Sequence, residues 1–119
     1  MTPVELSLQI AKILDDKKAH DIVALDVHEL TVITDAMVIA SGRNPLQVKA
    51  LADEVQDKLA QAGLEPLRTE GWQEAKWIIL DYGTVLVHVF HTEAREFYRL
   101  DRLWEHDGNR IPLPFTEEE

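Results

Sequence analysis

Acidic side chains are the residues of this chain that could most directly do chemistry, because carboxylates hold the metal ions of phosphoryl and nucleotidyl transfer. Such sites need carboxylates that converge on one side of a strand, commonly as an Asp-x-Asp pair, and the sequence contains no such pair. Asp26 and Glu29 are separated by two residues, which would place them on opposite faces of a continuing strand. Asp81 ends a predicted strand alone, and Asp35 lies in a connector. The spacing therefore argues against a catalytic carboxylate site.

Histidines are the next candidates, and the chain has five of them: His20, His28, His88, His91 and His106. His88 and His91 lie three apart on a predicted strand and therefore point to opposite faces. A zinc site on one helix would use a spacing of four and a third ligand. Because the chain has no cysteine, Cys-ligated zinc, disulfides and thiol catalysis are excluded. We interpret His88 as a satisfied residue of the sheet, and we expect neither a metal nor another cofactor.

The dipeptide Ser41-Gly42 follows a predicted strand and could begin a phosphate-binding loop, because glycine lets backbone amides approach an anion. Neither a Walker pattern nor a dinucleotide fingerprint follows, and no lysine stands where a phosphate lysine would. We therefore favour a strand-to-helix turn that needs a small residue. A small nucleotidyltransferase-like enzyme with a nucleotide at this turn is the alternative function.

Aromatic residues gather in the last three predicted elements: Trp77, Tyr82, Phe90, Phe97, Tyr98 and Trp104. Rigid aromatic rings beside charged groups are typical anchors of protein interfaces. We expect Phe90, Phe97 and Trp104 to belong to the core. Trp77 and Tyr82 lie at the two ends of one strand and on its opposite faces, so at most one of them faces the core. The other is predicted to show an exposed ring.

The elements that position these residues follow from apolar periodicity and from capping signals. Thr2 and Asn44, each followed by proline, begin helices, and Gly63 provides a left-handed stop. The prediction is a helix after Thr2 that ends near 16–18, strands over 21–27 and 36–41, a helix from Pro45 to the stop at Gly63, strands over 66–70, 77–82 and 84–91, and a helix capped by Thr92 that contains Phe97, Leu100 and Trp104.

This order, α-β-β-α-β-β-β-α, predicts one α/β sandwich with a mixed five-stranded sheet and flanking helices. The connector over 28–35 is short enough for an antiparallel pair, and Gly83 indicates a tight hairpin or bulge. The domain is expected to span residues 1–104. Residues 105–119 form an acidic tail with spaced prolines, which would cover a groove, pack on a second copy, or remain disordered.

The net charge of −10, from 22 acidic and 12 basic residues, bears on the choice of partner. Such a surface repels phosphate backbones and favours a basic protein patch, although high acidity is also compatible with simple solubility. No apolar run approaches the ~20 residues of a membrane helix, and the N-terminus has no signal-like pattern. We expect a cytoplasmic protein with no membrane partner.

Several sequence motifs occur together in the order typical of one family. In that order the sequence resembles the ribosomal silencing factor (Iojap-like) family, and the match spans about residues 4–104. The motifs are Asp21-Ile22-Val23-Ala24-Leu25-Asp26-Val27, Thr34-Asp35, Ile39-Ala40-Ser41-Gly42, Gln47-Val48-Lys49-Ala50, Glu70-Gly71, Trp77, Leu80-Asp81-Tyr82-Gly83, Val87-His88-Val89-Phe90, Arg95-Glu96-Phe97-Tyr98 and Leu103-Trp104.

The resemblance implies a nucleotidyltransferase-like fold without catalytic acids, and therefore a binding factor rather than an enzyme. It implies docking on a basic ribosomal protein at the intersubunit face of the large subunit, with little or no direct contact to nucleic acid. The bound factor would hinder joining of the small subunit and so repress translation, with a further role in assembly of the large subunit. A homodimeric scaffold is another alternative, because exposed aromatics beside a sheet also suit self-association.

The same resemblance implies which residues bind the partner. We expect Trp77, Asp81 and Tyr82 to contribute most, followed by Glu70, His88 and Tyr98. Trp77 and one tyrosine would be desolvated anchors, and the two carboxylates would pair with basic residues of the partner. The chain departs from the family pattern at Ala36-Met37, at Pro45-Leu46, where a polar-then-Arg pair is usual, and at Thr84, which replaces an acid.

Overall fold

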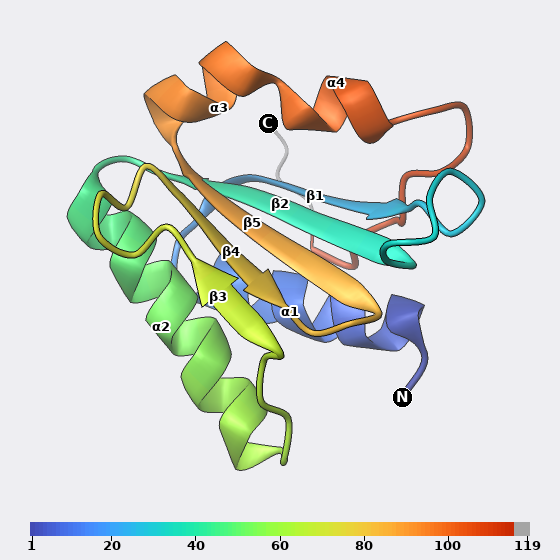
Figure 1. Cartoon of the computed structure of the whole chain (residues 1–119), viewed down its shortest axis with the longest axis horizontal. Coiled ribbons are helices and arrows are strands. Elements are labelled where there is room, and N and C mark those ends of the chain that lie inside the picture. Colours follow the sequence, from blue (N-terminus) through green and yellow to red (C-terminus); the bar gives the residue numbers. More distant parts are fainter. Residues whose placement is uncertain (116–119) are drawn as a thin grey trace.

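The computed structural model describes residues 1–115 of the 119-residue chain (Figure 1). Its elements follow the predicted order, with one additional helix at the end. They are α1 (Pro3–Asp16), β1 (His20–Asp26), β2 (Ala36–Gly42), α2 (Pro45–Gln61), β3 (Arg68–Glu70), β4 (Trp77–Asp81), β5 (Val85–His91), α3 (Thr92–Tyr98) and α4 (Leu100–Trp104).

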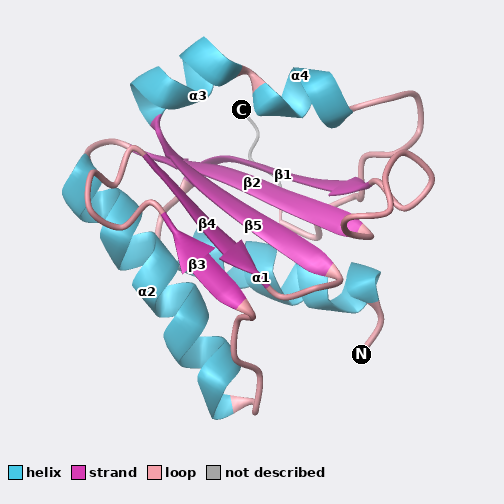
Figure 2. Cartoon of the chain, viewed as in Figure 1, coloured by secondary structure: helices cyan, strands magenta, loops and turns pink. Residues whose placement is uncertain are grey.

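The five strands form one mixed sheet in the order β1-β2-β5-β4-β3. The central strands β2 and β5 are parallel, whereas the pairs β1–β2, β4–β5 and β3–β4 are antiparallel. Helices α1 and α2 cover one face of the sheet, and α3 and α4 lie on the other face (Figure 2). The predicted mixed five-stranded α/β domain is therefore confirmed.

The first two predicted helix starts have the expected caps. The Thr2 hydroxyl accepts from the Glu5 amide at 3.1 Å, and the Glu5 carboxylate accepts from the Thr2 amide at 2.9 Å. These reciprocal bonds satisfy amides that have no partner within the helix. In α2 the Asn44 side chain accepts from the Gln47 amide at 2.8 Å. The helix ends at Gln61, and Gly63 follows with a φ of +87°, in the left-handed region that glycine adopts readily.

The C-terminal helix differs from the prediction. Arg99 has a left-handed φ of 51° and divides the expected single helix into α3 and α4. Thr92 is the first helical residue rather than the cap, and its hydroxyl donates to the Gly42 carbonyl at 2.9 Å. Because the break changes the helix direction, Leu100 and Trp104 reach the sheet while Phe97 stays outside, 79% exposed. Placing Phe97 in the core was therefore wrong.

Two apolar layers stabilise the domain, one on each face of the sheet. The larger layer lies between the sheet and the helices α1 and α2, and the smaller one lies beneath α3 and α4. Phe90 is fully buried in the smaller layer, and Trp104 packs against it, as predicted for both. No helix within residues 1–115 is long and apolar enough to cross a lipid bilayer.

The segment after α4 lies along the free edge of β1. The Asp26 amide donates to the Asn109 carbonyl, and the Ile111 amide donates to the Ala24 carbonyl, both at 2.8 Å. Ile111 is buried, and Leu113 and Phe115 pack against the larger apolar layer. Residues 109–115 thus cover an edge that would otherwise offer unpaired backbone groups. The last four residues of the predicted tail, 116–119, lie outside the described part of the chain.

We predict that Ile111→Ala lowers the free energy of unfolding by about 3 kcal/mol, because it removes a buried side chain from the larger layer. Urea denaturation followed by circular dichroism measures this change. Leu103→Ala is the matched control, since Leu103 is 68% exposed and should change stability by no more than about 0.5 kcal/mol. Equal stability of the two variants would contradict the packing of the segment on β1.

Candidate functional site

One region of the sheet has helices on only one of its two faces. Helices α3 and α4 pack over β1, β2 and β5, and they leave the edge formed by β4 and β3 open (Figure 1). Side chains alternate along β4, so Trp77, Ile79 and Asp81 share this side, with Arg68 paired to Asp81 and Glu70 paired to Ile79 in β3. We call this surface the open face; it consists of Arg68, Glu70, Trp77, Ile79, Asp81, His88, Phe97 and Tyr98.

Trp77 is the centre of the open face, and its ring is held from three sides. It stacks on Phe90 with ring centroids 4.8 Å apart, and it meets Tyr98 at 5.0 Å. Its indole Nε1 donates to Nδ1 of His88 at 3.1 Å. Trp77 is half-buried, so one part of a fixed ring remains available to a partner. A ring that is already ordered loses little conformational freedom on binding, which is what an interface anchor requires.

His88 lies beneath this ring at the centre of β5 and is almost fully buried. Because its Nδ1 accepts from Trp77, the proton of the neutral ring belongs on Nε2, which has no hydrogen-bond partner among the described residues. Burial lowers the pKa of His88 to about 4, so the ring is neutral near pH 7. We expected both ring nitrogens of His88 to have hydrogen-bond partners, and only Nδ1 has one among the described residues.

The charged part of the open face is an internal network centred on Arg68. Its Nε lies 3.1 Å from Asp81 Oδ2, and its Nη1 lies 2.7 Å from Glu70 Oε2. Asp81 also accepts from the Gly83 amide at 2.8 Å and so stabilises the turn before β5. Such surface pairs contribute little to stability because water screens them. The two carboxylates are therefore already partnered, but by a residue that is itself exposed.

Tyr82 lies on the opposite side of the sheet from the other predicted residues. It is 8% exposed within the larger apolar layer, and burial raises its pKa to about 12. Its hydroxyl has no hydrogen-bond partner within residues 1–115. The cause is the strand period, since residue 82 points away from residues 77 and 81. Between Trp77 and Tyr82, Trp77 is therefore the one with an accessible ring.

The structure brings together five of the six predicted site residues and adds three that were not predicted. Glu70, Trp77, Asp81, His88 and Tyr98 lie on the open face. The additions are Arg68, Ile79 and Phe97. The alternation from Trp77 to Asp81 is a signal that could have found Ile79, whereas the contacts of Arg68 depend on how β3 and β4 are aligned. No signal in the sequence pointed to the break at Arg99 that exposes Phe97.

The chemistry of this surface is that of recognition. Rigid aromatic rings form its centre and charged groups form its rim, which is the anatomy of a protein-binding surface. Among residues 1–115 no three histidine, aspartate or glutamate side chains converge to hold a metal ion. The fold is that of a small α/β domain, and the open face has the composition of a protein-interaction surface.

Comparisons with known proteins narrow this class. A crystal structure of a protein from Chromobacterium violaceum has a TM-score of 0.84 at 35% identity, covering 98% of this chain and 95% of that chain. The ribosomal silencing factor of Bacillus subtilis is 41% identical over 90 residues, which is 76% of each protein. The ribosomal silencing factor of Halalkalibacterium halodurans is 38% identical over 104 residues, covering 87% of this chain and 89% of that protein.

A family model described as ribosomal silencing factor during starvation matches residues 2–119. This chain therefore belongs to the ribosomal silencing factor family, as its motifs indicated. The match continues past Trp104, where the resemblance noted in the sequence ended. Membership makes the protein a ribosome-associated regulator of translation, in a family named for silencing ribosomes rather than for a chemical reaction.

We predict that folding stability falls as the pH is lowered from about 6.5 to 4, and that His88 is one cause. In this range the unfolded chain, with an ordinary histidine pKa of 6.5, binds a proton that the folded chain, with a pKa of about 4, does not. The contribution of His88 should approach about 3 kcal/mol at the acidic end.

Urea unfolding of the natural chain and of His88→Gln, repeated across this pH range, measures the effect. The variant should show a shallower loss of stability with falling pH. His106→Gln is the control, because it replaces an exposed histidine by the same residue. Parallel curves for the natural chain and His88→Gln would show that His88 does not titrate as described.

Proposed function

We propose that in the cytoplasm the open face docks on a basic protein of the large ribosomal subunit at its intersubunit face. The bound factor then blocks joining of the small subunit, which represses translation. The observation that supports this best is the Trp77 ring, which is fixed by Phe90, Tyr98 and His88 yet half-exposed beside two carboxylates. An ordered aromatic anchor with an acidic rim suits a basic protein surface.

The charge of the whole chain supports a protein partner over ribosomal RNA. With a net charge of −10, the surface opposes close approach to phosphate backbones, whose binding draws on many Lys and Arg contacts. The same charge speeds encounter with a basic protein patch through electrostatic steering. The proposal therefore places little or no contact on nucleic acid, even though the surroundings are rich in it.

Repression requires only that the bound domain occupy space between the two ribosomal subunits. The domain measures 33 × 32 × 27 Å, which is large compared with the gap between two closely apposed surfaces. A body of this size held at an intersubunit contact prevents association without any catalytic group. The affinity of docking then determines how much of the large subunit is blocked.

Arg68 already forms ion pairs with the two carboxylates that would contact the partner. A basic residue of the partner must either displace Arg68 from Asp81 and Glu70 or share them with it. Arg68 and Glu70 are largely exposed, so their ion pair is weak and easily rearranged. Asp81 is more enclosed and is also held by Gly83, so it would keep its orientation during the exchange.

We predict that Trp77→Ala weakens binding to purified large subunits by at least ~2 kcal/mol, which is roughly 30-fold. Asp81→Ala should also weaken binding, and more strongly at low salt than at high salt. Co-sedimentation at several salt concentrations measures both effects, and a subunit-joining assay with the same samples tests the repression. Tyr82→Phe is the control, because that side chain is buried on the other face.

Retained binding and retained blockade in Trp77→Ala would place the docking surface elsewhere. If Tyr82→Phe weakened binding as much as Trp77→Ala, a general loss of structure would be the better explanation. A change in solution mass on mixing Trp77→Ala with the natural chain would point to the homodimer alternative instead.

We further predict that Arg68→Gln binds large subunits at least as tightly as the natural chain, with a several-fold faster association at low salt. The substitution removes a cation and frees two carboxylates, which increases the negative potential that steers a basic partner. Stopped-flow association measured at two salt concentrations tests this. Arg102→Gln, an exposed change outside the open face, controls for net charge alone. Slower association of Arg68→Gln than of Arg102→Gln would mean that Arg68 itself contacts the partner.

A further inference from the structure

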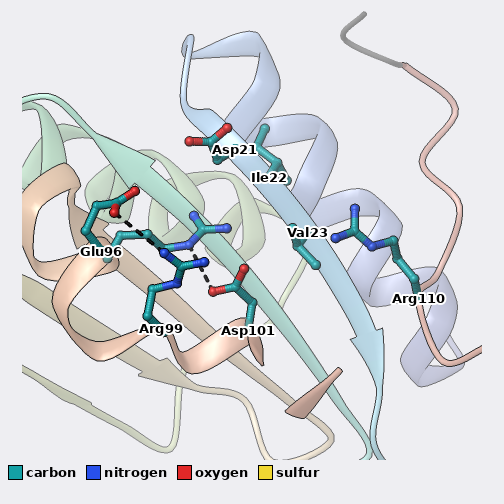
Figure 3. A pocket seen from close by; sticks show the side chains of 8 residues that line it. Asp21, Ile22, Val23, Glu96, Arg99, Asp101 and Arg110 are labelled. Atoms are coloured by element: carbon teal, nitrogen blue, oxygen red, sulfur yellow. Dashed lines mark hydrogen bonds and ion pairs between the residues drawn. The ribbon is translucent and has the colours of Figure 1, made fainter. Parts of the chain in front are cut away.

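A hollow of about 660 Å³ lies away from the centre of the open face, between the start of β1, the α3–α4 corner and the segment after α4 (Figure 3). Three arginines line it, Arg95, Arg99 and Arg110, together with Asp21 and the apolar side chains of Ile22 and Val23. These arginines are a quarter of the 12 basic residues of a chain whose net charge is −10. None of the three belongs to the open face.

The position of the hollow in the sheet is the one where open α/β folds bind ligands. The parallel strands β2 and β5 end side by side, with Gly42 paired to His91. β1 runs the other way, so its first residue, His20, pairs with Ser41 at that same end. In open sheets ligands lie outside the carboxyl ends of the parallel strands, at the point where the strand order reverses. Asp21, the second residue of β1, and Arg95, which comes after β5, lie at this end and both line the hollow.

Arg95 is the side chain that makes this a prepared site. It is buried, with Nη1 donating to the Ser41 hydroxyl at 2.8 Å and Nε donating to Asp101 at 3.3 Å. Two of its three nitrogens are thus occupied, and Nη2 has no hydrogen-bond partner among the residues described. Since Arg95 lines the hollow, a guanidinium group held on two sides has one nitrogen left for a ligand. Such fixed guanidinium groups are well suited to phosphate oxygens.

Two unusual backbone conformations shape the rest of the site. Arg99 has a φ of 51° and Asp21 a φ of 52°, a region that non-glycine residues seldom adopt. The conformation of Arg99 ends α3. Arg99 Nη1 lies 3.6 Å from Glu96 Oε1 (Figure 3). The second lies in the irregular stretch of β1 between His20 and Val23. Backbone strain of this kind is concentrated at functional sites.

We propose that this hollow binds a phosphate-bearing small molecule of nucleotide size. Arg95 and Arg99 hold the phosphate, and the Asp21 carboxylate accepts hydrogen bonds from hydroxyl groups of the ligand. The apolar surface of Ile22 and Val23 packs against its less polar part. The volume lies within the ~300–1,000 Å³ typical of small-molecule sites.

A small ligand fits the charges better than a nucleic acid does. The lining contains three arginines and three acids, Asp21, Glu96 and Asp101, so it is close to neutral while the rest of the chain is strongly acidic. A single phosphate group meets the local arginines, whereas a polyanion would extend over acidic surface. Tighter binding of RNA than of a nucleotide is therefore the competing result in the test.

The test is titration of the full chain with adenosine 5′-monophosphate and with adenosine, followed by amide chemical shifts and by calorimetry. We expect saturable binding of the nucleotide, with shifts concentrated at Ser41, Val23 and Arg95, and at least tenfold weaker binding of adenosine. Arg99→Gln should weaken nucleotide binding several-fold or more. Arg102→Gln is the matched control, because it removes an equal charge outside the hollow.

The outcomes separate clearly. Absence of saturation up to about 10 mM nucleotide, which corresponds to almost no affinity, would overturn the proposal. Equal binding of adenosine and its monophosphate would overturn the role of the phosphate. A folded Arg99→Gln chain with unchanged affinity would overturn the site, and tighter binding of a short single-stranded RNA would make it a nucleic-acid surface. None of these results bears on docking through Trp77, which co-sedimentation tests separately.

Discussion

Parallel pairing of β2 and β5 at the centre of the sheet determines where every other part of this protein lies. All residues of β2 are buried, and its seven register pairs with β5 run from Ala36–Val85 to Gly42–His91. Parallel strands cannot be joined by a tight turn, so α2 must cross between them and the β3–β4 strands must occupy the far edge. One end of this pair borders the arginine-lined hollow, and β4 beside β5 forms the open face.

The two-residue period of β4 then decides which side chains are available at the surface. Trp77, Ile79 and Asp81 face outward because Ile78, Leu80 and Tyr82 are needed in the larger apolar layer. Ile78 and Leu80 are fully buried, so a shift of register by one residue would expose them and bury a carboxylate. The core thereby constrains the open face, because Trp77 cannot change its position in the strand without loss of stability.

Much of the fold follows from the sequence, because the relevant signals are local. The caps at Thr2 and Asn44 and the stop at Gly63 are short-range effects, and the buried strands have a plain apolar pattern. The break at Arg99 has no such signal, since arginine is a good helix former and the left-handed conformation follows from packing of α4 on the sheet. The partners of Arg68 are likewise tertiary, because they depend on how β3 and β4 are aligned. The open face was thus predictable through the alternation of β4, and its charge network and exposed Phe97 were not.

The short helix α3 connects the two surfaces. Tyr98 contacts the Trp77 ring on one side, while Arg95 and Arg99, three residues before it and one after, line the hollow on the other. A ligand in the hollow would change docking only if it bound the docked and free states with different affinity, and docking would then change ligand affinity by the same factor. With Arg95 held by Ser41 and Asp101, the backbone of α3 is poorly placed to move as a unit. Arg99, which lines the hollow and directly follows Tyr98, is the left-handed residue at which the chain changes direction between α3 and α4.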